Sequence, residues 1–111
     1  MSKTNPRRSN GSRRTAVRRR VLAAYDTCWI CGRPVDKSLP PGNPWSAEVD
    51  EVVPVSKGGS PYDFHNCRLA HRHCNQVRSN RSVAYARAKL RGTRARQAKA
   101  SSYALKASEW E

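Results

Sequence analysis

The sequence has few of the residues that build a large apolar core. Only 37% of its 111 residues are hydrophobic, with one Phe and one Met. No apolar run is long enough to span a membrane, and the polar, basic residues 1–10 contain no apolar signal segment. We therefore expect a cytoplasmic protein of one small domain, without membrane contact, whose thin core needs a metal or disulfide staple.

Acidic residues are also scarce, and their positions are uneven. The formal net charge is +14, from 22 Lys and Arg against 8 Asp and Glu. No acid lies in residues 3–20 or in residues 64–108, and both segments are rich in Arg. Basic arms of this strength are typical of contacts to phosphate backbones. We expect a polyanion, such as a nucleic acid, as the partner, because a basic surface without one would repel itself.

Two pairs of metal-ligating residues, each with a two-residue spacer, stand far apart in the chain. They are Cys28 with Cys31 and His71 with Cys74. Such pairs can close on one tetrahedral zinc from opposite sides. His73 would break the spacing, so His71 is the favoured ligand. A reducing compartment disfavours the alternative, a Cys28–Cys31 disulfide, and Cys67 is expected to be a small core residue.

The remaining pattern predicts a small α+β domain. Val17, Val21 and Tyr25 recur at helical spacing. The expected elements are a helix over 13–26, a Pro-rich and Gly-rich loop over 36–46, strands over 47–53 and 67–71 around a wide turn, and a helix over 72–90 broken near 79–80. The expected organisation is a disordered basic tail (1–12), the domain (13–91) and a basic C-terminal extension (92–111).

Four motifs follow the Cys28–Cys31 pair along the chain. They are Val49-Asp50-Glu51-Val52-Val53-Pro54, Ser56-Lys57-Gly58-Gly59, Asn66-Cys67-Arg68-Leu69 and His71-Arg72-His73-Cys74-Asn75. In this combination residues 28–80 resemble the HNH endonucleases, especially short phage and actinobacterial ones. The resemblance implies a ββα-metal (His-Me finger) fold with a structural zinc, an N-terminal helix and a basic C-terminal helix.

The resemblance also implies a function. It predicts a DNA endonuclease or nickase that hydrolyses phosphodiester bonds with Mg²⁺ or Mn²⁺. Asp50 corresponds to the metal-binding Asp, Asn66 to the Asn that tethers the loop between the strands, and Asn75 to a second metal ligand. Relatives of this size are often phage-encoded and linked to genome packaging, which makes a phage terminase the expected protein partner.

Glu51 is the one departure, since it stands where the family has a His that acts as general base. Three outcomes fit this substitution: Glu51 acts as the base, it joins Asp50 as a metal ligand, or the site is inactive. His65 is a candidate surrogate base. Glu48, two residues before Asp50 on the expected strand, supports the metal ligand or is simply an exposed acid.

Two functions therefore compete with the nuclease. One is a zinc-stapled DNA-binding module on the same fold, inactive because of Glu51. The other is a structural, ribosome-type basic zinc protein. The pair Asp50 and Asn75 favours the nuclease, because an acid aimed at phosphate would only weaken a pure binding module.

Overall fold

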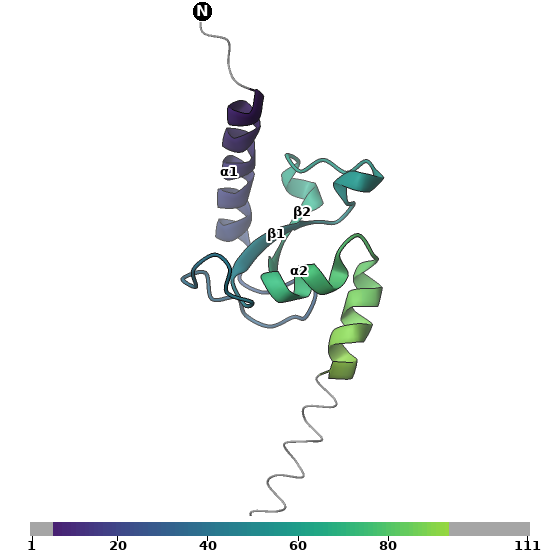
Figure 1. Cartoon of the computed structure of the whole chain (residues 1–111). Helices are drawn as coiled ribbons and strands as arrows, with labels where there is room; N and C mark the ends of the chain where they lie inside the picture. The colour runs from purple at the N-terminus through teal and green to yellow at the C-terminus, as the bar shows by residue number, and fades with distance from the viewer. Residues whose placement is uncertain (1–5, 94–111) are drawn as a thin grey trace, which may run out of the picture.

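The computed structural model describes residues 6–93, in which a β-hairpin lies between helices. The elements are α1 (Pro6–Ala24), β1 (Ala47–Glu51), the short 3-10 helices η1 (Val55–Lys57) and η2 (Phe64–Asn66), β2 (Cys67–His71) and α2 (Arg72–Arg78). Residues 83–93 form a further helix after α2. In Figure 1, α1 rises beside the hairpin, whereas α2 lies across its other side. The small α+β, ββα-type fold expected from the sequence is confirmed.

The hairpin is antiparallel, and its register shows which residues lie at each of its two ends. Ala47 pairs with His71 at one end, and Glu51 pairs with Cys67 at the other. β2 matches its predicted span, but β1 is two residues shorter than predicted. β1 ends at Glu51. Val52 N still donates to the main-chain O of Asn66 at 2.7 Å, and beyond it the side chain of Asn66 bonds to the main-chain groups of Val53.

Asn66 closes the loop between the strands. Its Oδ1 accepts a hydrogen bond from Val53 N at 2.9 Å, and its Nδ2 donates to Val53 O and to Ser60 O, both at 3.1 Å. One amide side chain thus joins both ends of the turn, as an Asn with two donors and an acceptor can do. The tether expected at Asn66 is present.

Helix α1 begins earlier than the sequence indicated. The prediction of a tail over residues 1–12 is wrong for residues 6–12, which are helical. Pro6 suits the first turn of a helix, and Gly11 costs only about 1 kcal/mol in a helix interior. Residues 1–5 of the predicted tail lie outside the described residues. Val17 and Val21 are buried as predicted, and the Tyr25 ring stacks on Phe64.

The predicted break after α2 is confirmed. α2 ends at Arg78, and Ser79 follows with a φ of 52°, which a helix cannot accommodate. The chain then resumes as the helix over 83–93, of which Leu90 is buried. The rest of the predicted basic extension, residues 94–111, lies outside the described residues.

The core is small and is centred on the hairpin. Leu69 is the largest fully buried side chain, and the buried cysteines Cys28, Cys67 and Cys74 fill much of the remaining space. Cys67 is a core residue, as expected. Within the described part of the chain, no helix is long and apolar enough to cross a membrane.

We expect Gly59→Ala to destabilise the domain. A Cβ at Gly59 would lie 1.7 Å from Val53 O and 2.9 Å from Asn66 Nδ2, so the closed loop must open. Overpacking of this kind costs roughly 1–3 kcal/mol, measurable as a lower free energy of unfolding in urea. Gly11→Ala is the matched control, because nothing lies within 4 Å of its Cβ. Equal stability of the two variants would contradict this account of the turn.

Candidate functional site

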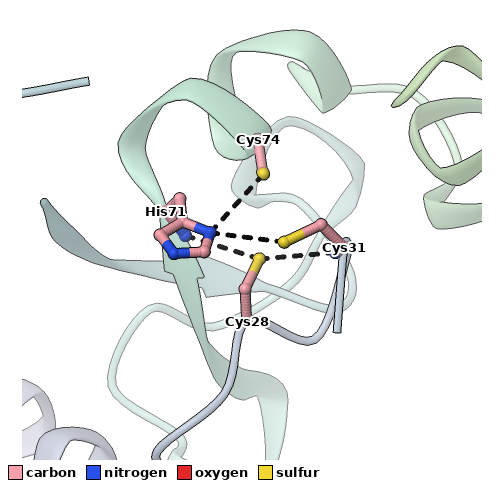
Figure 2. A group of neighbouring side chains, drawn as sticks. All are labelled: Cys28, Cys31, His71 and Cys74. Atoms are coloured by element: carbon pink, nitrogen blue, oxygen red, sulfur yellow. Dashed lines mark hydrogen bonds between the residues drawn. The ribbon is translucent and has the colours of Figure 1, made fainter. Parts of the chain in front are cut away.

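The four expected zinc ligands come together at one end of the hairpin. The Sγ atoms of Cys28, Cys31 and Cys74 and a ring nitrogen of His71 all lie within 4.8 Å of one another. His71 Nδ1 is 3.3 Å from Cys31 Sγ and 3.7 Å from Cys74 Sγ (Figure 2). Tetrahedral zinc, with bonds of about 2.3 Å to sulfur and 2.0–2.1 Å to nitrogen, requires ligand atoms roughly 3.5–3.8 Å apart. The cluster is therefore compatible with a structural zinc.

Local structure orients each ligand. The Cys28–Cys31 knuckle turns at Gly32, whose φ of 76° suits a glycine, and Gly32 N donates to Cys28 O at 2.8 Å. The far ring nitrogen of His71, Nε2, lies 3.1 Å from Pro34 O. Donation from Nε2–H to this carbonyl leaves Nδ1 as the lone-pair nitrogen facing the thiols, as metal-bound histidines require. All four cysteines of the chain are free of disulfides.

The thiols perturb one another strongly. A hydrogen bond from Cys74 lowers the pKa of Cys28 to about 4, against the effect of burial. The same bond, together with burial, raises the pKa of the Cys74 thiol, and burial raises the pKa of Cys31. One negative charge is thus already favoured in the cluster. A divalent cation would replace the remaining thiol protons, so its binding should release protons.

The cluster lies far from the acidic end of β1. His71 pairs with Ala47, four residues before Glu51, which is roughly 13 Å along a strand. Four protein ligands leave no open position for a substrate, which is the pattern of structural zinc sites. A zinc held there would brace the fold, and it would be separate from Asp50 and Glu51 at the other end of β1.

Asp50 is buried between the knuckle and α2. Its side chain is only 5% exposed, and its Oδ2 accepts hydrogen bonds from Trp29 Nε1 at 3.0 Å and from Arg78 at 2.8 Å. Burial raises the pKa of the Asp50 carboxyl, and the Arg78 and Trp29 bonds oppose that rise. Oδ1 takes part in neither bond. This oxygen could serve as a ligand of Mg²⁺ or Mn²⁺, which prefer oxygen donors.

Arg78 was not singled out by the sequence, yet it organises this end of β1. Besides Asp50, it donates to Glu51 O, to Val52 O at 2.8 Å and, from Nε, to Arg81 O at 2.9 Å. The one feature of the sequence that could have pointed to Arg78 is its position three residues after Asn75, on the same face of the expected helix. Trp29, which lies between Cys28 and Cys31 in the sequence, also orients Asp50 through its indole N–H.

Glu51 points away from Asp50, as successive strand residues do. Its side chain lines a hollow of about 240 Å³ between β1 and α1, together with Arg14 and Arg18 of α1. One metal ion held by both carboxylates does not suit this arrangement. The geometry favours the alternative in which Glu51 acts as a base, or the one in which the site is inactive.

The other candidate residues take different positions. Asn75 is half-buried on α2. His65 is exposed, with its ring edge-on to Phe64 at 5.7 Å, and within the described residues its ring bonds to neither acid. Glu48 is half-buried, and its Oε2 is covered without a hydrogen-bond partner.

Comparison with known proteins agrees with this architecture. Residues 28–81 match the family model of the HNH endonucleases, a segment that contains the zinc cluster, both strands and α2. Residues 28–81 of the chain are thus a segment of the HNH endonuclease family. No curated protein and no solved structure matches the chain.

Replacement of a zinc ligand should abolish metal binding and folding together. We expect the wild-type protein to contain one zinc per chain and Cys74→Ser to contain none, with a loss of the cooperative thermal transition, because the small core depends on the metal. Zinc content by atomic emission and melting by circular dichroism measure both effects. Cys67→Ala, a buried cysteine outside the cluster, is the control and should keep its zinc. An unchanged melting curve after zinc removal from the wild type would contradict a structural role.

Arg78→Met should destabilise the domain by about 3–5 kcal/mol, because it leaves the Asp50 charge buried without its partner. Removing both charges in Asp50→Asn/Arg78→Met should recover part of this loss. Urea unfolding of the two single variants and the double variant measures the coupling. Arg87→Met is the control: it removes an exposed arginine that lies over the Trp29 ring and donates to Trp29 O at 2.6 Å, but that pairs with no buried acid. Strict additivity would show that the Asp50–Arg78 pair contributes no net stability.

Proposed function

We propose that this protein is a metal-dependent DNA endonuclease or nickase. The observation that carries the proposal is Asp50, a buried carboxylate held in one orientation by Trp29 and Arg78 at the end of β1. A binding protein with a net charge of +14 gains nothing for DNA affinity from an acid at this place. Membership of the HNH endonuclease family supports the same conclusion.

In this proposal each residue has a separate task. Asp50 and Asn75 hold the divalent ion, Mg²⁺ or Mn²⁺, which would neutralise charge on the scissile phosphate and on the leaving oxygen. Glu51 accepts the proton of the attacking water. Asn66 keeps the loop after β1 closed, which fixes the direction of both acids.

The setting of the reaction rests on the resemblance alone. We infer that the enzyme acts in the cytoplasm, on DNA contacted through its phosphates with little sequence preference. Phage genome packaging with a terminase is the corresponding biological role, and it would place the enzyme in the host cytoplasm.

A second function has its own supporting observation. Arg78 already neutralises Asp50, so the pair is also a sufficient structural ion pair in a protein that does not cleave DNA. Combined with Glu51 in the position of the family His, this favours a zinc-stapled DNA-binding module as the alternative.

Plasmid cleavage separates the two functions. We expect the zinc-loaded wild-type protein to nick supercoiled plasmid with Mg²⁺ or Mn²⁺ and to be inactive when neither ion is added. Asp50→Asn should remove cleavage while DNA binding is kept or improved, because the ligand charge is lost but the shape stays. Circular dichroism checks that this variant is folded, since it leaves Arg78 without its acid. Binding without nicking under any divalent ion, with a well-folded protein, would favour the binding module.

Glu51→Gln tests the base directly. It keeps the shape of the side chain and removes its charge and basicity, so we expect a loss of about 10²–10⁴ in the cleavage rate. Glu51→His restores the family residue and should keep or raise activity near neutral pH. If Glu51→Gln cleaves like the wild type, Glu51 is not the base, and His65→Ala tests the surrogate. An inactive wild type beside an active Glu51→His would identify the natural protein as the binding module.

A further inference from the structure

Helix α1 brings arginines to the side of β1 that Glu51 faces. The hollow of about 240 Å³ beside Glu51 is lined by Arg14 and Arg18 of α1, with apolar atoms of Val17, Val49 and Pro61 forming the rest of its wall. Arg14 and Arg18 are one helical turn apart and therefore share a face of α1. This helix lies outside residues 28–81, the segment that matches the HNH family.

Within the described residues, Arg14 and Arg18 form no ion pair with an acidic side chain. The recorded ion pairs join Lys37 to Asp26 and Arg78 to Asp50. Neither involves an arginine of α1. Arg18 makes only long contacts, 3.4 Å from both terminal nitrogens to Ala47 O. Like charges at i and i+4 oppose helix formation, and an anion between them would remove that cost.

Other arginines of α1 hold the helix in place against the loop. Arg13 lies over the Tyr62 ring at 4.1 Å and Arg20 over the Phe64 ring at 4.3 Å. Such cation–π contacts contribute about 0.5–1 kcal/mol each at exposed sites. They fix α1 beside the loop that Asn66 closes, so Arg14 and Arg18 are presented to the end of β1 by a braced element.

We propose that Arg14 and Arg18 bind a phosphodiester group of the DNA strand in the hollow beside Glu51. This inference rests on the proposed nuclease function and extends its substrate site to α1. A guanidinium offers two parallel N–H donors to phosphate oxygens, and two of them one turn apart can hold one phosphate from two directions. Their charge also offsets the repulsion between the phosphate and the Glu51 carboxylate, which a base next to a phosphate must overcome.

DNA binding measured without added Mg²⁺ or Mn²⁺, so that the zinc-loaded protein stays intact, tests the contact independently of cleavage. Fluorescence anisotropy with a labelled short duplex should show Arg14→Gln binding on the order of tenfold more weakly, the effect of one lost charge-assisted hydrogen bond. Its log–log salt slope should fall by roughly 0.9. Arg19→Gln is the matched control, because Arg19 lies on the same helix but lines a different, shallow hollow with Ser12 and Thr15. Arg14→Lys should recover part of the affinity, because it restores the positive charge.

A double-mutant cycle locates the phosphate. The effects of Glu51→Gln and Arg14→Gln on DNA affinity should not add, because both groups face the same phosphate, whereas those of Glu51→Gln and Arg19→Gln should add. Equal losses for Arg14→Gln and Arg19→Gln, with additivity in both cycles, would overturn the inference and leave α1 as a general basic surface.

The outcome is separable from that of the nuclease proposal. A wild-type protein that never cleaves DNA but shows the Arg14–Glu51 coupling keeps the phosphate site on a binding module. Conversely, an active wild type whose Arg14→Gln variant matches Arg19→Gln in affinity, salt slope and cleavage at saturating DNA refutes the phosphate site and leaves the nuclease standing.

Discussion

The cluster of Cys28, Cys31, His71 and Cys74 is the constraint on which the rest of this small structure depends. Two of its ligands come from the knuckle after α1, and the other two come from the end of β2 and the start of α2. A metal bound there would join three segments that the thin core alone holds weakly, because so little apolar surface is buried in a domain of this size. The position of every functional side chain is thus set relative to this one site.

Trp29 connects the metal-ligand cluster to the acidic end of β1. It lies between two zinc ligands in sequence, its main-chain N–H bonds to Leu69 O at 2.9 Å, and its indole bonds to Asp50. Two guanidinium groups lie over its ring, that of Arg78 at 5.2 Å and that of Arg87 at 5.8 Å from the ring centre. Loss of the zinc should therefore loosen Asp50 although the two sites are separate, since the knuckle supports one of the two donors that orient this carboxylate.

Spacing predicted the parts of the structure that depend on local pattern. The zinc ligands, β2 and the break after α2 follow from residue type and interval, whereas the tether at Asn66 was expected from the resemblance to the HNH family. The Asp50–Arg78 pair could not be found in this way, because it joins residues 28 positions apart and arginine is common throughout the chain. The start of α1 was missed because Asn, Gly and Pro near the terminus indicate a tail, whereas Pro6 is compatible with a first helical turn.

In the folded protein, arginines from both basic segments of the sequence lie beside the acidic residues at the end of β1. Asp50 and Glu51 are neighbours in the chain, but they face opposite sides of β1. Arg78 of α2 contacts the first, and the Arg14 and Arg18 side chains of α1 lie beside the second. The first carboxylate is neutralised inside the protein, so it adds little repulsion toward DNA. The second shares an open hollow with arginines that have no protein acid to pair with, and a phosphate entering there would meet cations first. This division allows a chain of net charge +14 to keep two adjacent acids and still attract a polyanion.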